Sequence, residues 1–361
     1  MIETKDQPQV RLTVRNGGWI LIVAALFTIA LLVWALLPVV MRRVSHAPGD
    51  GRTVESYAFD LTNITVPKDS IVPALRHRDF LPRWNDPPVE TGAAIEALNE
   101  AQRGKILVSS DLVVGVVIGD VQRAYPIRLL NVHEVINDTV DGVPIAVTYN
   151  WHCDSVRVFD RRIGDRTVTL VSSGLFRNSN ALFYDETKPA GAETLWQQIT
   201  GEGLTGPHAG QSMTIVPSTL VNWSTWLAAH PTSDVVMENS EFHKRYKKAH
   251  PDAYFLKHDL SFDVTPLADE NVMSWKTRTI AVEVNGRRLI FPVQTILDAD
   301  VDAWTYDVDG TMLTFTRDRN AHAVEVNADV PLDDVLYAFW FAQHAFWPDA
   351  EVVAVPIDSD A

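Results

Sequence analysis

An uncharged apolar run at residues 18–41 constrains this chain more than any other feature. It reads GWILIVAALFTIALLVWALLPVVM, and about 20 apolar helical residues are enough to cross the hydrocarbon core of a bilayer. Arg15 and Arg42 bound the run, and Trp19 and Trp34 lie towards its ends, where interfacial aromatic residues are common. The apolar region of a secretory signal is shorter, about 7–15 residues. The run therefore predicts an uncleaved transmembrane helix, with the membrane as its partner.

The basic residues that flank the run favour neither orientation strongly. Three precede it and three follow it: Lys5, Arg11, Arg15, Arg42, Arg43 and Arg52. A single anchor more commonly keeps a short N-terminal tail inside and a large acidic domain outside. We therefore predict a cytoplasmic tail at residues 1–17 and a single-pass inner-membrane protein whose soluble domain is periplasmic or otherwise extracytoplasmic.

The composition is that of a globular protein. The chain has 361 residues, of which 46% are hydrophobic and 21% charged, which is enough for a sizeable buried core. Its net charge of −15 disfavours a nucleic-acid partner, because proteins that bind the phosphate backbone are usually basic. Cys153 is the single cysteine, so the chain can form neither an intrachain disulfide nor a site with several thiolates.

Beyond the apolar run, the pattern predicts a β-rich α+β fold with short helices. Residues 42–90 contain many prolines and predict a linker and an extended lead-in without long helices. Residues 91–103 predict a helix with Thr91 as its N-cap. Two further helices are expected at residues 129–136 and 222–229. Alternating or continuous apolar runs predict strands at residues 113–118, 123–125, 145–149, 156–159 and 168–171.

The C-terminal part of the chain repeats features of the first part. Residues 118–127 align without a gap with residues 284–293, and both read as strand, tight turn, strand, aromatic residue, proline. Trp223 precedes Pro231 by the same offset as Trp340 precedes Pro348. We therefore predict two degenerate related β units. The expected order is a first repeat with the candidate site at residues 91–237, a connector at 238–278 and a second repeat at 279–361.

The first polar cluster of the first repeat contains His133 and Glu134. On a helix over residues 129–136, His133 would share a face with Asn137, and Glu134 with Asp138. A histidine and a carboxylate presented together suit metal binding or proton transfer. The alternative is a solvated helix end.

The second and third clusters leave similar alternatives open. His152 and Cys153 face opposite sides if their segment is extended, and share a site only if it is a loop; a lone cysteine is more often a small buried apolar residue than a nucleophile. Residues 172–180 combine small and amide side chains after a strand, which indicates a backbone that approaches something closely. Residues 191–210 predict a long loop, a mild indication of function.

Together these segments resemble the bacterial family known as domain of unknown function 3179. The matching runs are RAYP, HEVIND, TY…C…S, FDR, SGLFRNSN, YD, LWQQ and TGP…AG. The resemblance is strong over residues 110–240 and weak over 275–355, and it implies a fold rather than a reaction. The family usually reads TYCPLCGS, where this chain reads TYNWHCDS. Asn150 thus replaces the first cysteine of the pair that a two-thiol redox or soft-metal function would need.

Three functions remain as hypotheses. The favoured one is binding of a small polar or anionic ligand in a cleft of the first repeat; the expected ligand-binding residues are Arg123, Tyr149, Arg177, Asn178, Trp196 and Gln198. The second is a zinc or copper site with His133, His152 and Cys153 as ligands. The third is a hydrolase or transferase with His133, Glu134 and Cys153 as catalytic residues, Cys153 being the nucleophile. A shared function requires His133, Cys153 and Arg177 to line one cleft.

The orientation of the anchor can be tested directly. A reporter enzyme that is active only outside the cytoplasm, fused after Ala361, should be active, because the acidic domain is expected to be translocated. A cytoplasm-specific reporter at the same position is the control and should be inactive. The reverse pair of results would invert the orientation, and release of the protein from membranes by carbonate would contradict the anchor.

Overall fold

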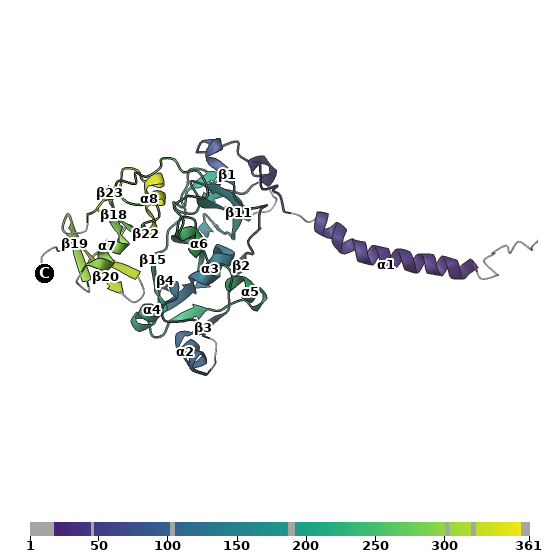
Figure 1. The fold of residues 1–361 in the computed structure, drawn as a ribbon, viewed down its shortest axis with the longest axis horizontal. Helices are drawn as coiled ribbons and strands as arrows, with labels where there is room; N and C mark the ends of the chain where they lie inside the picture. Colours follow the sequence, from purple (N-terminus) through teal and green to yellow (C-terminus); the bar gives the residue numbers. More distant parts are fainter. Residues whose placement is uncertain are drawn as a thin grey trace, which may run out of the picture. The chain divides into compact units, whose positions relative to one another are not determined.

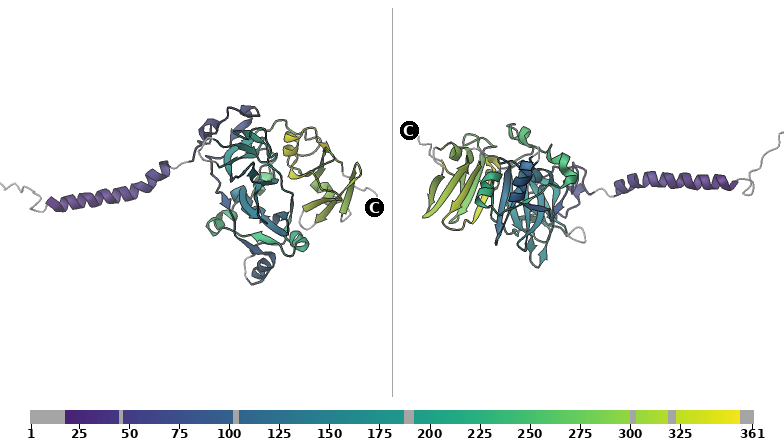
Figure 2. Two further views of the ribbon diagram at one scale, coloured as in Figure 1. Left: turned by 180° about the vertical axis from the view of Figure 1, so that it is seen from behind. Right: turned by 90° about the horizontal axis from the view of Figure 1, so that it is seen from below.

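The structure is a computed structural model that describes residues 18–44, 47–101, 105–186, 192–299, 303–318 and 323–354. The chain divides into two compact units, Met1–Ala47 and Pro48–Ala361, which are considered one at a time. The ribbon is drawn in Figure 1 and from two further sides in Figure 2.

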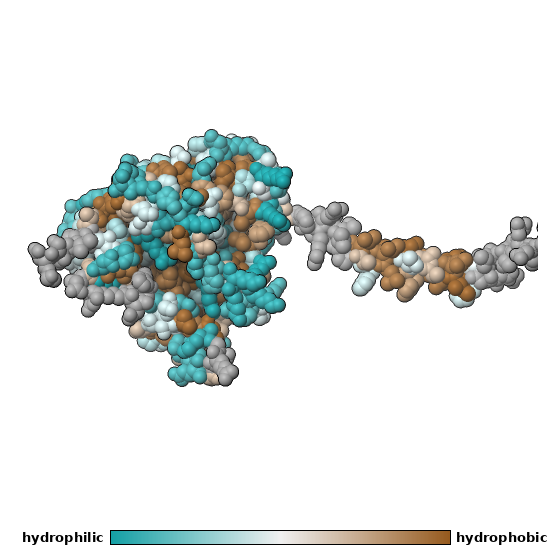
Figure 3. Space-filling view, in the orientation of Figure 1, coloured by the Kyte–Doolittle hydropathy of each residue, from teal (hydrophilic) through white to brown (hydrophobic). Residues whose placement is uncertain are grey.

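The described part of the first unit is one continuous helix, α1 (Gly18–Val44). Its stretch Gly18–Leu36 is long and apolar enough to cross a membrane, and it is not buried against the protein. A signal sequence near the N-terminus meets the same criteria of length and composition. The apolar residues follow one another along this helix (Figure 3). Thr28 donates a hydrogen bond to the carbonyl of Ala24 over 2.8 Å, which satisfies its hydroxyl within the helix, as a hydrocarbon environment requires.

The second unit confirms the predicted β-rich α+β class: short helices accompany several small sheets. Its first β module begins with a hairpin and a helical turn, continues as a three-stranded meander, and closes with strand, helix and strand. These elements are β4 (Leu112–Ile118), β5 (Val121–Pro126), α3 (Ile127–His133), β6 (Val135–Val140), β7 (Val143–Asn150), β8 (Ser155–Asp160), β15 (Ser218–Asn222), α4 (Trp223–Ala229) and β16 (Asp234–Val236).

The second β module contains the same succession of elements. They are β17 (Arg278–Val284), β18 (Arg287–Pro292), α7 (Val293–Asp298), β19 (Ala303–Val308), β20 (Thr311–Asp318), β21 (Ala323–Ala328), β22 (Asp334–Phe339), α8 (Trp340–Phe346) and β23 (Glu351–Val352). The sheet orders correspond as well, β15-β4-β5-β16 in the first module and β22-β17-β18-β23 in the second. In both, the last pair is parallel and the others are antiparallel.

Equivalent side chains occupy equivalent places in the two modules. Tyr125 in β5 and Phe291 in β18 are both fully buried and precede the proline at which each strand ends. Trp223 and Trp340 are the first residues of α4 and α8, and both are buried. The correspondence that the sequence offsets predict is therefore present in the fold.

The first module carries an insertion between β8 and β15. It forms the two-stranded ribbon of β9 and β10 and, together with β1 (Ile71–Pro73) of the lead-in, the sheet β1-β11-β12-β13-β14. The strands are β9 (Arg162–Ile163), β10 (Arg166–Thr167), β11 (Leu170–Arg177), β12 (Asn180–Asp185), β13 (Leu195–Gln197) and β14 (Gly203–Thr205). The loop expected at residues 191–210 is wrong only where β13 and β14 pair with neighbouring strands, while residues 172–180 fall in β11, the turn after it and the first residue of β12.

The lead-in has no long helix before α2, as its prolines predict. It supplies the helical turns η2 (Val54–Tyr57) and η3 (Lys68–Ser70) and edge strands for three sheets, followed by α2. These are β1 (Ile71–Pro73), β2 (Trp84–Asn85), β3 (Val89–Thr91) and α2 (Gly92–Ala101). The hydroxyl of Thr91 accepts the backbone N–H of Ala94 over 3.2 Å, which confirms it as the N-cap.

The connector between the modules lies largely outside regular structure. It contains the short helical pieces η4 (Ser240–Phe242), α5 (His243–Tyr246) and α6 (Asp252–Phe255). Elsewhere the two modules meet directly, β8 beside β22 and β15 beside β21. Arg157 of β8 forms a two-pronged ion pair with Asp334 of β22, and its Nη2 lies 2.8 Å from Oδ2.

The Arg157–Asp334 pair should support the packing of the two modules. Both side chains are buried, and Asp334 also accepts from Arg288 over 2.8 Å. Asp334→Asn leaves buried guanidinium charge uncompensated, so we expect the free energy of unfolding to fall by about 3 kcal/mol. The exposed Asp309→Asn, which removes one partner of Arg287, is the matched control and should cost under about 1 kcal/mol. Urea denaturation followed by tryptophan fluorescence measures both; equal costs would contradict the expectation.

Candidate functional site

The helix that carries His133 is shorter than its sequence pattern predicts. α3 ends at His133 because Glu134 has a φ of 57°, a left-handed backbone conformation that stops a helix. The backbone N–H of Glu134 bonds to the carbonyl of Leu130, and its own carbonyl accepts from Tyr149. Asn137 and Asp138 lie in β6. The expected helical faces, His133 with Asn137 and Glu134 with Asp138, are therefore wrong.

Both ring nitrogens of His133 are used within the protein. Nδ1 lies 2.6 Å from the carbonyl of Pro82, and Nε2 lies 2.8 Å from the hydroxyl of Tyr246. The ring is almost completely buried beside Trp84 and Phe242. Burial lowers the pKa of His133 to about 4, so the neutral ring donates at Nδ1 and accepts at Nε2. These contacts give His133 the role of joining α3 to the lead-in and to α5.

Glu134 is a buried carboxyl group with one close polar partner. Ser172 of β11 donates its hydroxyl to Oε2 of Glu134 over 3.1 Å. Burial raises the pKa of Glu134 to about 7, against the smaller lowering by the Ser172 hydrogen bond. A carboxyl group with such a pKa exchanges a proton near neutrality, but Glu134 is 1% exposed and lies between β6 and β11 without solvent access.

Cys153 and His152 occupy a turn between β7 and β8. The thiol of Cys153 is fully buried and faces the carbonyl of Ser179 at 3.4 Å. Burial raises its pKa well above the ordinary value, so it stays a thiol at neutral pH, as inert cysteines do. The ring of His152 stacks on Trp151 with centroids 3.5 Å apart, and burial lowers its pKa to about 3.

Gln198 and Asn178, two expected ligand-binding residues, have their amide groups engaged internally. Gln198 accepts from Ser155 and Asn180, both over 2.7 Å, and donates to Thr148 over 3.1 Å. Asn178 accepts from the backbone N–H of Thr265 and donates to its carbonyl, each over 3.0 Å. These amides organise the insertion and hold the connector against it.

The other expected binding residues are placed differently. Trp196 is buried in β13 and stacks on His208. Arg177, at the end of β11, is half-buried over Phe346 and lies 3.5 Å from Gln197 Oε1. Arg123 of β5 is ion-paired with Asp138 at 2.8 Å and Asp234 at 3.5 Å, which ties the first sheet to the meander. Among the described residues, no group of three His, Cys, Asp or Glu side chains could hold a metal ion.

A cleft of about 810 Å³, which we call the connector cleft, opens elsewhere. Its walls are α3, the start of β17 and the connector around α5 and α6. Side chains from all of these elements reach it: Asn131, Tyr246, Lys247, Asp252, Phe255 and Arg278. Tyr149 also lines it and is the only expected site residue among its lining residues.

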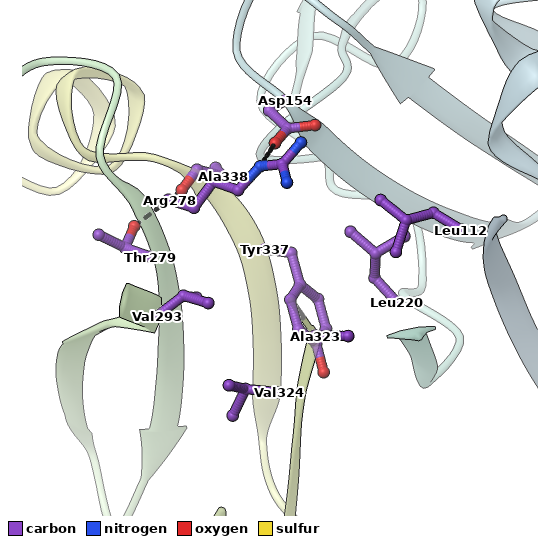
Figure 4. Close-up of a pocket in the computed structure, with 10 residues that line it drawn as sticks. All are labelled: Leu112, Asp154, Leu220, Arg278, Thr279, Val293, Ala323, Val324, Tyr337 and Ala338. Atoms are coloured by element: carbon purple, nitrogen blue, oxygen red, sulfur yellow. Dashed lines mark hydrogen bonds and ion pairs between the residues drawn. The ribbon is translucent and has the colours of Figure 1, made fainter. Parts of the chain in front are cut away.

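Arg278 is the cation that the fold holds most firmly at this cleft. Its Nε donates to Asp154 Oδ2 over 2.6 Å, and Asp154 Oδ1 accepts the hydroxyl of Tyr149 over 2.7 Å. Figure 4 shows Asp154 and Arg278 meeting beside a small neighbouring cavity that Leu112 also lines. Asp154 raises the pKa of Arg278. The two terminal nitrogens of this guanidinium make no hydrogen bond to the described residues, and its side chain is 41% exposed.

Few features of the sequence point to this site. Arg278 begins a strand of the second module, and Asp154 follows the cysteine in a motif whose familiar form has glycine there. A buried acid at position 154 does need a cation, and this is the one signal that could have prompted a search for Arg278. Nothing in the local pattern indicated that the partner lies more than a hundred residues away.

Comparison with known proteins yields one match. The family model described as "Protein of unknown function (DUF3179)" matches residues 78–332. No curated protein and no solved structure matches the chain.

The raised pKa of Glu134 can be tested by measuring how the stability of the protein depends on pH. The unfolded chain ionises Glu134 near 4.5 and the folded chain near 7, so its contribution to stability is complete below about 4.5 and is lost as the pH rises to about 7. Glu134→Gln should remove this loss, and the melting temperature of the variant minus that of the wild type should rise between pH 4.5 and 7. The difference isolates Glu134 from His133 and His152, whose lowered pKa values act in the opposite direction.

The exposed Glu90→Gln in β3 is the matched control and should give a flat difference across the same range. A flat difference for Glu134→Gln as well would show that the carboxyl group ionises normally in the folded protein. Differential scanning calorimetry at several pH values measures all three proteins.

Proposed function

The chain belongs to the DUF3179 family of proteins of unknown function, and we propose that it is a membrane-anchored, extracytoplasmic protein that binds a small anionic ligand in the connector cleft. The anion-binding group is the guanidinium of Arg278. The observation that carries the proposal is its geometry: Nε is fixed by Asp154, while both terminal nitrogens remain available at the cleft.

A guanidinium held in this way suits an oxyanion. Its planar fork can donate two parallel hydrogen bonds to a carboxylate or a phosphate. Because the Asp154–Tyr149 pair already fixes the arginine, a ligand would not have to immobilise it, and this saves part of the entropic cost of binding. The carboxyl group of Asp154 is buried at the far side of Arg278 and orients it without filling the cleft.

The cleft is less acidic than the chain as a whole. Lysine and arginine number 31 against 46 acidic residues in the whole sequence. The cleft lining contains four of the former (Lys105, Arg128, Lys247 and Arg278) and three acids (Asp111, Glu238 and Asp252), with His243 and His250 in addition. With Asp154, which pairs with Arg278 from outside the lining, cations and acids balance here, so an anion meets less repulsion than over the rest of this acidic protein.

Asn131 limits further which class of ligand fits the cleft. Its Oδ1 is buried at the cleft and has no hydrogen-bond partner among the described residues. A buried acceptor of this kind is normally satisfied, so a ligand that carries a hydrogen-bond donor beside its anionic group fits best. The rings of Tyr246 and Phe255 supply apolar wall, as small-molecule sites usually do.

Substitution of Arg278 tests the proposal. Titration of the full chain in detergent with inorganic phosphate and with succinate, followed by calorimetry, should show binding of at least one of them. Arg278→Gln should weaken that binding by about 10- to 100-fold, the equivalent of one lost charge-assisted interaction. Arg287→Gln is the matched control, since Arg287 is an arginine of similar exposure on the second module, and it should bind as the wild type does.

A conservative variant guards against misfolding. Arg278→Lys keeps a cation for the buried Asp154 but loses the fork, so it should fold and bind with intermediate affinity. Equal binding by all four proteins, or binding of neither anion by the wild type, would refute the proposal.

A further inference from the structure

We propose that the exposed basic segment at residues 243–257 is a docking surface for an anionic membrane face. The segment reads HKRYKKAHPDAYFLK. It contains five lysines and arginines and a single acid, Asp252, in a chain whose net charge is −15. Lys247 also lines the connector cleft, whereas Lys244 and Lys248 do not, so the test below changes only these two and is independent of what that cleft binds.

Two tyrosine side chains hold the segment in place. Tyr246 of α5 is 2% exposed, and its hydroxyl meets Nε2 of His133 at 2.8 Å. Tyr254 of α6 donates its hydroxyl to the carbonyl of His152 over 3.0 Å. The segment is therefore anchored from the inside at two points, while its four cations from residue 244 to 248 remain exposed.

The outward side chains are cationic. Lys244, Arg245, Lys247 and Lys248 are all exposed, and hydrophilic residues gather over α5 in the space-filling view (Figure 3). Lys244 lies in α5, and Lys248 lies in the turn that follows it, where its backbone N–H donates to the carbonyl of Arg245 over 2.9 Å. Within the described part of the chain, these four cations take part in no ion pair with an acid. Their charge is thus directed to the solvent rather than used to stabilise the fold.

Leu256, directly after α6, adds an apolar contact. It is 89% exposed, in a position next to Lys257. A single exposed leucine on a soluble surface has no special meaning, but a leucine among lysines has the composition of segments that lie at the interface of a bilayer, where apolar side chains enter the acyl boundary and cations remain with the headgroups.

The sequence position of α1 favours a bilayer over an acidic protein as the partner. Only residues 45–47 separate Val44, the last residue of α1, from Pro48, where the soluble unit begins. Three residues extend over roughly 10 Å at most. A membrane crossed by α1 would therefore be constantly available to this unit, and anionic lipids attract polybasic segments that are close to their surface.

A fluorophore at residue 256 tests the proposal. Leu256→Cys can be labelled selectively, because Cys153 is the only other cysteine and is completely buried. The full chain is reconstituted in vesicles of phosphatidylcholine alone or mixed with phosphatidylglycerol, each doped with a nitroxide-labelled lipid. Quenching should be at least about twofold stronger in the anionic vesicles and should decline with added salt, which screens the attraction.

Three further proteins make the result specific. In the labelled chain, Lys244→Glu with Lys248→Glu should abolish the extra quenching, whereas Arg278→Gln should leave it unchanged, which separates this surface from the anion site. A label at Met312→Cys, on the exposed side of β20, should be quenched equally little in both vesicles. Quenching that is absent in both, independent of lipid charge, or unaffected by the double substitution would overturn the proposal; complete absence would favour an acidic protein instead.

Discussion

The buried carboxylate of Asp154 is the group on which the arrangement of the cleft depends. Asp154 lies in a turn and has a φ of 48°. Its carboxylate accepts one hydrogen bond from the hydroxyl of Tyr149 in its own module and one from the guanidinium of Arg278 in the other module. A buried charge must be paired, so this turn and the first strand of the second module are held together. Three residues further on, Arg157 forms a second ion pair between the modules, with Asp334. Here the first module supplies the cation and the second module the acid. The cleft exists because two modules are held in register by these reciprocal ion pairs.

The repeated architecture was accessible from the sequence because it rests on local signals. The hairpin turns, the aromatic-proline ends of β5 and β18 and the tryptophans that begin α4 and α8 each have a short-range cause. One pair of positions shows how far the correspondence extends. A Cβ atom on Gly115 in β4 would meet the ring of Trp226 at 2.1 Å, whereas the corresponding positions of the second module are Ala281 and Gln343. The smaller glycine accompanies the larger ring.

The candidate site was less accessible, because it depends on contacts between distant parts of the chain. Polar residues in motifs look the same in a sequence whether they face a ligand or one another. Here Gln198, Asn180 and Ser155 hydrogen-bond to one another in the interior, between the sheet that contains β8 and the sheet that contains β12. Residues whose pattern is typical of a binding loop therefore form a polar part of the protein interior. The predicted end of α3 was wrong for a related reason: the left-handed backbone of Glu134 is stabilised by Tyr149 from another strand, which no helical periodicity reveals.

Asn150, the last residue of β7, contributes a side-chain hydrogen bond to the turn that follows it. The Oδ1 atom of Asn150 accepts the backbone N–H of Cys153 over 3.1 Å, in the turn where the resembling family has a pair of cysteines. The side chain of Asn150 thus stabilises this turn by a hydrogen bond. Cys153 packs as an apolar residue in the same buried cluster as Phe339, whose backbone N–H donates to the carbonyl of Cys153. In this turn Asp154 lies beside Arg278. The geometry of the cleft is therefore independent of thiol chemistry at this turn, which is why a search for function here leads to the connector and β17 rather than to the cysteine.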